Sequence, residues 1–100
     1  MKTILKIFTL LFGVVSFAQT IVTGTVNDEN GMPLPGSNVI VVGTSTGAIS
    51  DFDGKFKLNV SQSPPFTVQA SNVGFTSATQ EVTSNNQDIT FALVEGSFLD

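Results

Sequence analysis

The stretch that decides the fold is Asp53-Gly54-Lys55-Phe56-Lys57-Leu58-Asn59-Val60. Its last six residues alternate between polar and apolar side chains, which is the period of a β-strand with one buried face. The two residues before them are a hairpin signal, because glycine adopts the positive φ angles of a tight turn. The stretch therefore predicts a strand that exposes both lysines and buries the three apolar side chains.

Six other segments have the same short, alternating or β-branched character, and turn residues separate them. They lie at residues 21–26, 38–42, 46–50, 66–70, 76–82 and 89–94. No segment after Gln19 has the 3.6-residue apolar period of a helix. We therefore predict one all-β domain over residues 19–95, a seven-stranded antiparallel β-sandwich. The polar segment 76–82 is expected at a sheet edge.

The same pattern predicts which residues form the core and which form the turns. The residues expected in the core are Val22, Val26, Val39, Val41, Phe56, Leu58, Val60, Val68, Ile89, Phe91 and Leu93. The residues expected in turns are Gly31, Pro35, Gly36, Asp51, Asp53, Gly54 and Gly74.

For Asp51 and Asp53 two interpretations are open. Carboxylates spaced in this way before a glycine are candidate calcium ligands, or they accept hydrogen bonds from turn amides. No distal glutamate follows at the spacing of a calcium-binding loop. We therefore expect these aspartates to serve the turn and to bind no metal. If a metal site exists, Asp51 and Asp53 are its candidate ligands.

The first 18 residues have the features of a helical signal peptide. A short positive head precedes an uncharged run from Ile7 to Ala18, which as a helix spans only about 18 Å of the roughly 30 Å of membrane hydrocarbon. Ser16 and Ala18 are small residues at the −3 and −1 positions of a cut before Gln19. Export and cleavage between Ala18 and Gln19 are the interpretation; an uncleaved anchor or a buried helix is the alternative.

The composition argues against catalysis and against nucleic-acid binding. The chain contains no His, Cys, Trp, Tyr or Arg, so the usual general base, the thiol nucleophile and most zinc ligands are missing. The net charge of −4 becomes −6 if Lys2 and Lys6 leave with the signal peptide, and such a surface repels phosphate. We expect no enzyme activity and no cofactor.

Three stretches in the order seen here resemble the carboxypeptidase-regulatory-like domain, a seven-stranded sandwich of the transthyretin (prealbumin) type. They are residues 22–36, which include Thr23-Gly24-Thr25-Val26 and Pro33-Leu34-Pro35-Gly36, then Asn38–Thr44, then 46–58 with Asp51-Phe52-Asp53-Gly54. A fourth, Ser71–Phe75, departs from the family at Asn72, where an aromatic residue is usual. The resemblance covers residues 21–95 and carries no catalytic residue.

The tail, Leu93-Val94-Glu95 and then Phe98-Leu99-Asp100, resembles the end of this domain in TonB-dependent outer-membrane receptors of the SusC/RagA type. The resemblance implies a non-catalytic periplasmic N-terminal domain of a receptor for glycans or peptides, with residues 96–100 as a linker toward the TonB box. Its implied partners are the receptor's plug and barrel and the TonB-type energy-transducing complex. In such a receptor the barrel is the part that lies in the outer membrane, so this domain would contact the membrane only through the barrel. The chain is then a fragment of such a receptor or a truncated product.

Two other functions stay open, a stand-alone secreted binding sandwich and the accessory domain of an exported peptidase. Carbohydrate-binding sandwiches commonly use exposed Trp or Tyr as stacking platforms, and both are absent. The second alternative needs a separate catalytic domain that contains His. Both observations favour the receptor domain.

Processing gives the first testable prediction. Mass spectrometry of the exported protein should find Gln19 at the N-terminus, free or cyclised to pyroglutamate, because the apolar run and the Ser16-Phe17-Ala18 triplet match a signal-peptidase substrate. An intact Met1 in the cell-envelope fraction would contradict this interpretation.

Overall fold

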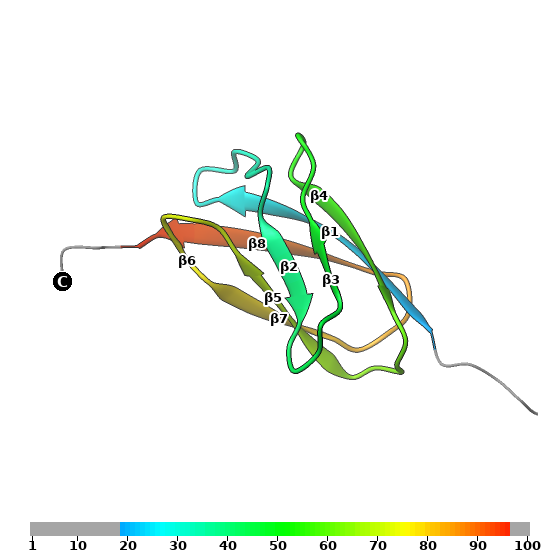
Figure 1. Ribbon diagram of the computed structural model, residues 1–100. Coiled ribbons are helices and arrows are strands. Elements are labelled where there is room, and N and C mark those ends of the chain that lie inside the picture. The colour runs from blue at the N-terminus through cyan, green and yellow to red at the C-terminus, as the bar shows by residue number, and fades with distance from the viewer. Residues whose placement is uncertain (1–18, 97–100) are drawn as a thin grey trace, which may run out of the picture.

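The computed structural model describes residues 19–96, which form eight β-strands and no helix (Figure 1). Accordingly, this part of the chain offers no long apolar helix that could cross a membrane. The expected leader up to Ala18 and residues 97–100 of the expected linker lie outside the described residues. The strands are β1 (Thr20–Asp28), β2 (Asn38–Val41), β3 (Gly47–Ile49), β4 (Lys55–Val60), β5 (Phe66–Ser71), β6 (Phe75–Thr76), β7 (Ala78–Val82) and β8 (Gln87–Glu95).

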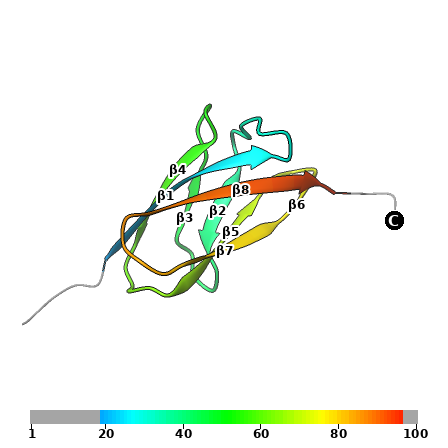
Figure 2. The same ribbon diagram turned by 180° about the vertical axis from the view of Figure 1, so that it is seen from behind.

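Two four-stranded sheets pack face to face, and the predicted β-sandwich is confirmed (Figures 1 and 2). One sheet has the order β4-β1-β8-β6 and the other the order β3-β2-β5-β7. All the hydrophobic residues expected in the core are buried between them. The core also includes three residues that were not on that list, Phe66, Ala70 and Val82.

β1 and β8 are neighbours in the middle of their sheet and run parallel, with Val22 opposite Gln87 and Asp28 opposite Leu93. The other strand pairs are antiparallel, as expected. β1 is the first strand and β8 the last. Because they run parallel, the described chain enters the sandwich at one end and leaves it at the other (Figure 1).

The expected edge strand at 76–82 is divided between the two sheets. β6 pairs with the end of β8, where Phe75 lies opposite Glu95, whereas β7 pairs with β5. The chain crosses from one sheet to the other at Ser77, which belongs to neither strand. Both pieces lie at sheet edges, and the division explains why there are eight strands rather than seven.

Gly24 allows the close packing at the centre of β1. It faces the core between Phe56 on β4 and Ile89 on β8, which are its neighbours on the two sides. A Cβ atom at this position would press on the Ile89 carbonyl oxygen and lie 2.5 Å from the Cζ atom of the Phe56 ring. The same ring packs against Phe91, with 6.1 Å between the ring centroids. The missing side chain therefore leaves the space that the Phe56 ring occupies.

This packing predicts that Gly24→Ala destabilises the domain by about 1–3 kcal/mol, the usual range for overpacking a core. The backbone oxygen of Ile89 cannot rotate away, so relief requires a shift of the strands. Gly96→Ala is the matched control, because its new Cβ would lie at an ordinary 3.6 Å from the Thr76 Oγ1 atom. Equal urea-denaturation midpoints for the two variants would show that the Phe56 ring does not depend on Gly24.

Candidate functional site

Three loops lie together at the end of the sandwich where β1 and β8 terminate (Figures 1 and 2). We call this end the loop end and define it by residues 29–37, 50–54 and 72–74, together with Asp28 and Glu95 at the strand termini. The opposite end holds the loops at 42–46, 61–65 and 83–86 and the start of β1. None of those three loops contains a charged residue, so we call it the neutral end.

Two loop-end segments, Asp28–Met32 and Asp51–Lys55, form the same five-residue turn. In each, the Oδ1 atom of the first aspartate accepts hydrogen bonds from the N–H groups two and four residues ahead, at 2.8–2.9 Å. The fourth residue of each turn is a glycine with a positive φ, 83° and 75° respectively. The aspartates therefore hold the turns, and the second residue of each turn, Glu29 or Phe52, is exposed to solvent.

The two metal candidates thus have different surroundings. Asp51 holds the N–H groups of Asp53 and Lys55 with a single oxygen, whereas the carboxylate of Asp53 extends into solvent. Within residues 19–96 no three Asp or Glu side chains gather closely enough to hold a metal ion. These contacts favour the turn interpretation.

A buried polar cluster fixes the loops to one another. The hydroxyl groups of Ser37 and Ser50 both donate to the Leu34 carbonyl oxygen, at 2.8 and 2.7 Å. The Ser50 hydroxyl also accepts from the Ser37 N–H, and the Ser37 hydroxyl accepts from the Asn72 side chain, each at 2.8 Å. Buried polar groups must find partners, and this cluster satisfies them by joining all three loops.

The tip of each loop carries one large apolar side chain that does not reach the core. The exposed fractions are 62% for Met32, 93% for Phe52 and 94% for Val73. A depression of about 290 Å³ lies beside Phe52 and is lined also by Pro35, Gly36, Ser50 and Asp51.

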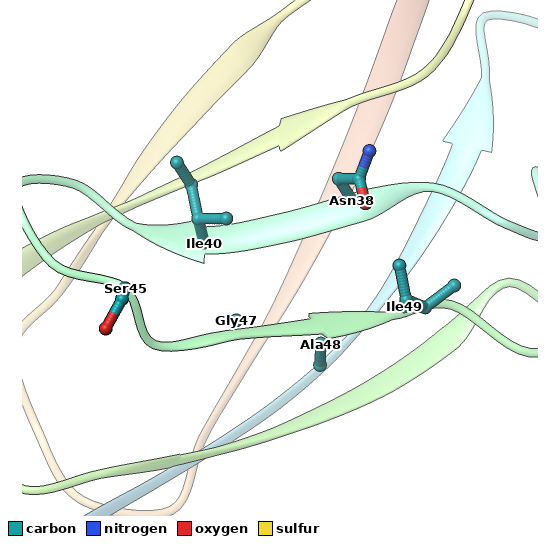
Figure 3. Close-up of a pocket in the computed structure, with 6 residues that line it drawn as sticks. All are labelled: Asn38, Ile40, Ser45, Gly47, Ala48 and Ile49. Atoms are coloured by element: carbon teal, nitrogen blue, oxygen red, sulfur yellow. The ribbon is translucent and has the colours of Figure 1, made fainter.

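A second depression, of about 280 Å³, lies on β2 and β3 (Figure 3). Asn38, Ile40 and Ile49 stand on one side of the two strands, and Gly47, opposite Ile40, leaves the space between them open. Ala48 points to the other side, and Ser45 completes the lining. This surface contains no charged or aromatic side chain, and its polar side chains are those of Asn38 and Ser45.

The turn residues predicted from the sequence all lie at the loop end, including Pro35, Gly36 and Gly74. The burial of Ser37 and Ser50 was not predicted from the sequence, nor was the shared role of Asp28 and Asp51 in the two turns. A signal for the second point is present, since both turns read Asp-x-Asn/Asp-Gly-x. No comparable signal marks Ser37 and Ser50, because serine is common in exposed loops.

In its described residues the chain is a small β-sandwich of two four-stranded sheets. The chain belongs to the CarboxypepD_reg-like domain family, whose model matches residues 22–99.

Curated relatives of the chain are TonB-dependent receptors. It is 44% identical over 84 residues to TonB-dependent receptor P3 of Formosa agariphila, an alignment that covers 82% of this chain and 8% of the receptor. It is 54% identical over 48 residues to TonB-dependent receptor SusC of Bacteroides thetaiotaomicron, covering 47% of this chain and 5% of that protein. The chain therefore spans less than a tenth of these relatives.

Solved structures share the fold at low identity. A chain in the crystal structure of an N-terminal interface mutant of a type II cohesin–X-dockerin complex from Acetivibrio cellulolyticus superposes with a TM-score of 0.64. It is 20% identical, and the match covers 77% of this chain and 58% of that one. A C-terminal interface mutant of the same complex gives a TM-score of 0.55 at 21% identity, covering 73% and 51%. These likenesses concern the fold alone.

The turn geometry predicts different effects for two aspartates that are two residues apart. Asp51→Ala should destabilise the domain by about 0.5–2 kcal/mol, the range for losing a side chain that caps backbone N–H groups, because two exposed turn N–H groups exchange a carboxylate acceptor for water. Asp53→Ala, the matched control, should change stability by about 0.5 kcal/mol or less, as for most exposed sites. Thermal unfolding measures both. If millimolar calcium raised the melting temperature of the native domain and Asp53→Ala abolished that rise, the metal interpretation would replace the turn.

Proposed function

We propose that this chain is the non-catalytic, periplasmic N-terminal domain of a TonB-dependent outer-membrane receptor. The observation that carries the proposal is the 44% identity with such a receptor over 82% of the chain. At that level of identity over a whole domain, the two domains are expected to occupy the same kind of protein. The signal-peptide pattern of residues 1–18, directly before the domain, agrees with export.

The geometry suits a domain that is attached to a larger protein at one end. The parallel pairing of β1 and β8 separates the entry and exit of the chain by the length of the sandwich. Once the leader is removed, the new N-terminus at Gln19 lies at the opposite end of the sandwich from the attachment to the receptor body, and the domain extends from that body with its loops exposed. Its role in this proposal is interaction, with the receptor's own plug or with the TonB-type energy-transducing complex.

The side of the outer membrane on which the domain lies is tested with an epitope tag inserted in the 61–65 loop of the complete receptor. Protease added to intact cells should leave the tag uncut, and protease added after the outer membrane is permeabilised should remove it. A tag placed in a surface loop of the barrel is the control for protease activity on intact cells. Cleavage of the 61–65 tag in intact cells would place the domain on the cell surface and contradict the periplasmic location.

The interaction role is tested by deleting residues 20–95 from the complete receptor while keeping the leader. We expect unchanged receptor abundance in the outer membrane and slower growth on the nutrient that the receptor imports. Abundance is measured in isolated outer membranes, so that a folding defect of the barrel is not mistaken for a loss of function. Wild-type growth of the deletion strain on every nutrient tested would argue against any role in transport.

A further inference from the structure

The loop end exposes apolar side chains to solvent. Met32, Phe52 and Val73 are exposed at three separate loop tips, although burying a Phe side chain is worth about 1.5–3 kcal/mol. Phe52 in particular stands on a turn that Asp51 holds in place, beside the depression lined by Pro35 and Gly36. Exposed aromatic side chains beside a cavity are typical of the anchors of protein–protein interfaces.

Charge is distributed along the same axis. Asp28, Glu29, Asp51, Asp53 and Glu95 lie at the loop end. The loops of the neutral end contain no charge, and the carboxylates nearest to them are Glu81 at the end of β7 and Asp88 at the start of β8. Of the two lysines of the described chain, Lys55 closes the Asp51–Lys55 turn at the loop end, and Lys57 lies further along β4. The loop end therefore carries five carboxylates and one ammonium group. A surface that complements the loop end is therefore positively charged, and it carries an apolar recess for Phe52.

The exit of the chain lies at this end as well. The last described residue, Gly96, donates its N–H to the Gly74 carbonyl oxygen in the third loop, at 2.9 Å. Polypeptide that continues beyond residue 96 therefore starts beside Val73. Attachment at this point gives the continuing chain a high effective concentration near the loop end.

We propose that the loop end docks on a positively charged surface of the receptor polypeptide that follows Asp100, with the Phe52 side chain as the anchor. This proposal rests on the proposed function, because it requires a receptor body downstream of the domain. The buried Ser37–Ser50 cluster holds the three loops in place before contact, so little ordering is needed on docking.

The test is photo-crosslinking within the complete receptor in cells. The photoreactive amino acid p-benzoylphenylalanine replaces Phe52, and in a matched control it replaces Val42, which is 48% exposed at the neutral end. Mass spectrometry should map the crosslink from position 52 to a Lys- or Arg-rich peptide downstream of Asp100 in the same polypeptide. Position 42 should give no crosslink to that peptide.

A charge test accompanies the crosslink. Glu29→Lys with Asp53→Lys should lower the crosslink yield from position 52 severalfold, because the two new positive charges repel a positively charged surface. The turns should remain intact, because the carboxylates of Glu29 and Asp53 face solvent and accept none of the turn hydrogen bonds. Glu81→Lys, an exposed reversal on β7, should leave the yield unchanged. Equal crosslink yields from positions 42 and 52 would overturn the docking proposal. So would a yield from position 52 that Glu29→Lys with Asp53→Lys leaves unchanged.

A crosslink from position 52 to a different polypeptide, including the energy-transducing protein, would also overturn this proposal while leaving the proposed function intact. Failure of the proposed function has a separate sign, cleavage of the 61–65 tag in intact cells.

Discussion

The parallel pairing of β1 with β8 is the constraint on which the rest of the structure depends. It places the first and last strands side by side at the centre of one sheet, so the start of β1 and the end of β8 lie at opposite ends of the sandwich. The pairing needs Gly24, because any side chain there would collide with the Ile89 carbonyl group and the Phe56 ring. A single glycine thus permits both the dense core and the close parallel pairing of β1 with β8.

The loop end depends on a second, polar constraint. Crossing between two sheets three times at one end leaves backbone carbonyl and N–H groups that no strand can satisfy. The Leu34 carbonyl oxygen takes two serine hydroxyl groups, and Asn72 ties in the third loop. In the described chain no buried side-chain nitrogen or oxygen lacks a partner. With polar groups satisfied inside, the apolar tips and the carboxylates are what this end presents to solvent.

The β1–β8 pairing and the polar cluster at the loop end both fit a role in contacts with other parts of a larger protein. A domain whose first and last strands end on opposite sides, and whose loop end is acidic with apolar tips, is suited to mediate contact between segments of a larger protein. In the proposed function the larger protein is a TonB-dependent receptor, the class to which the matching relatives belong. The depression on β2 and β3, which is uncharged, offers less specificity to a partner.

The sequence alone determined the β-sandwich, its core residues and the positions of its turns, because side-chain alternation and turn residues are local signals. It also carried the motif resemblance that pointed to the family. It could not determine that β1 and β8 run parallel, since alternation reads the same for either direction of pairing. Nor could it show that the 76–82 segment is shared between two sheets, or that Ser37 and Ser50 are buried. These features, and the gathering of Phe52, Val73 and five carboxylates at one end, arise from contacts between residues far apart in the chain.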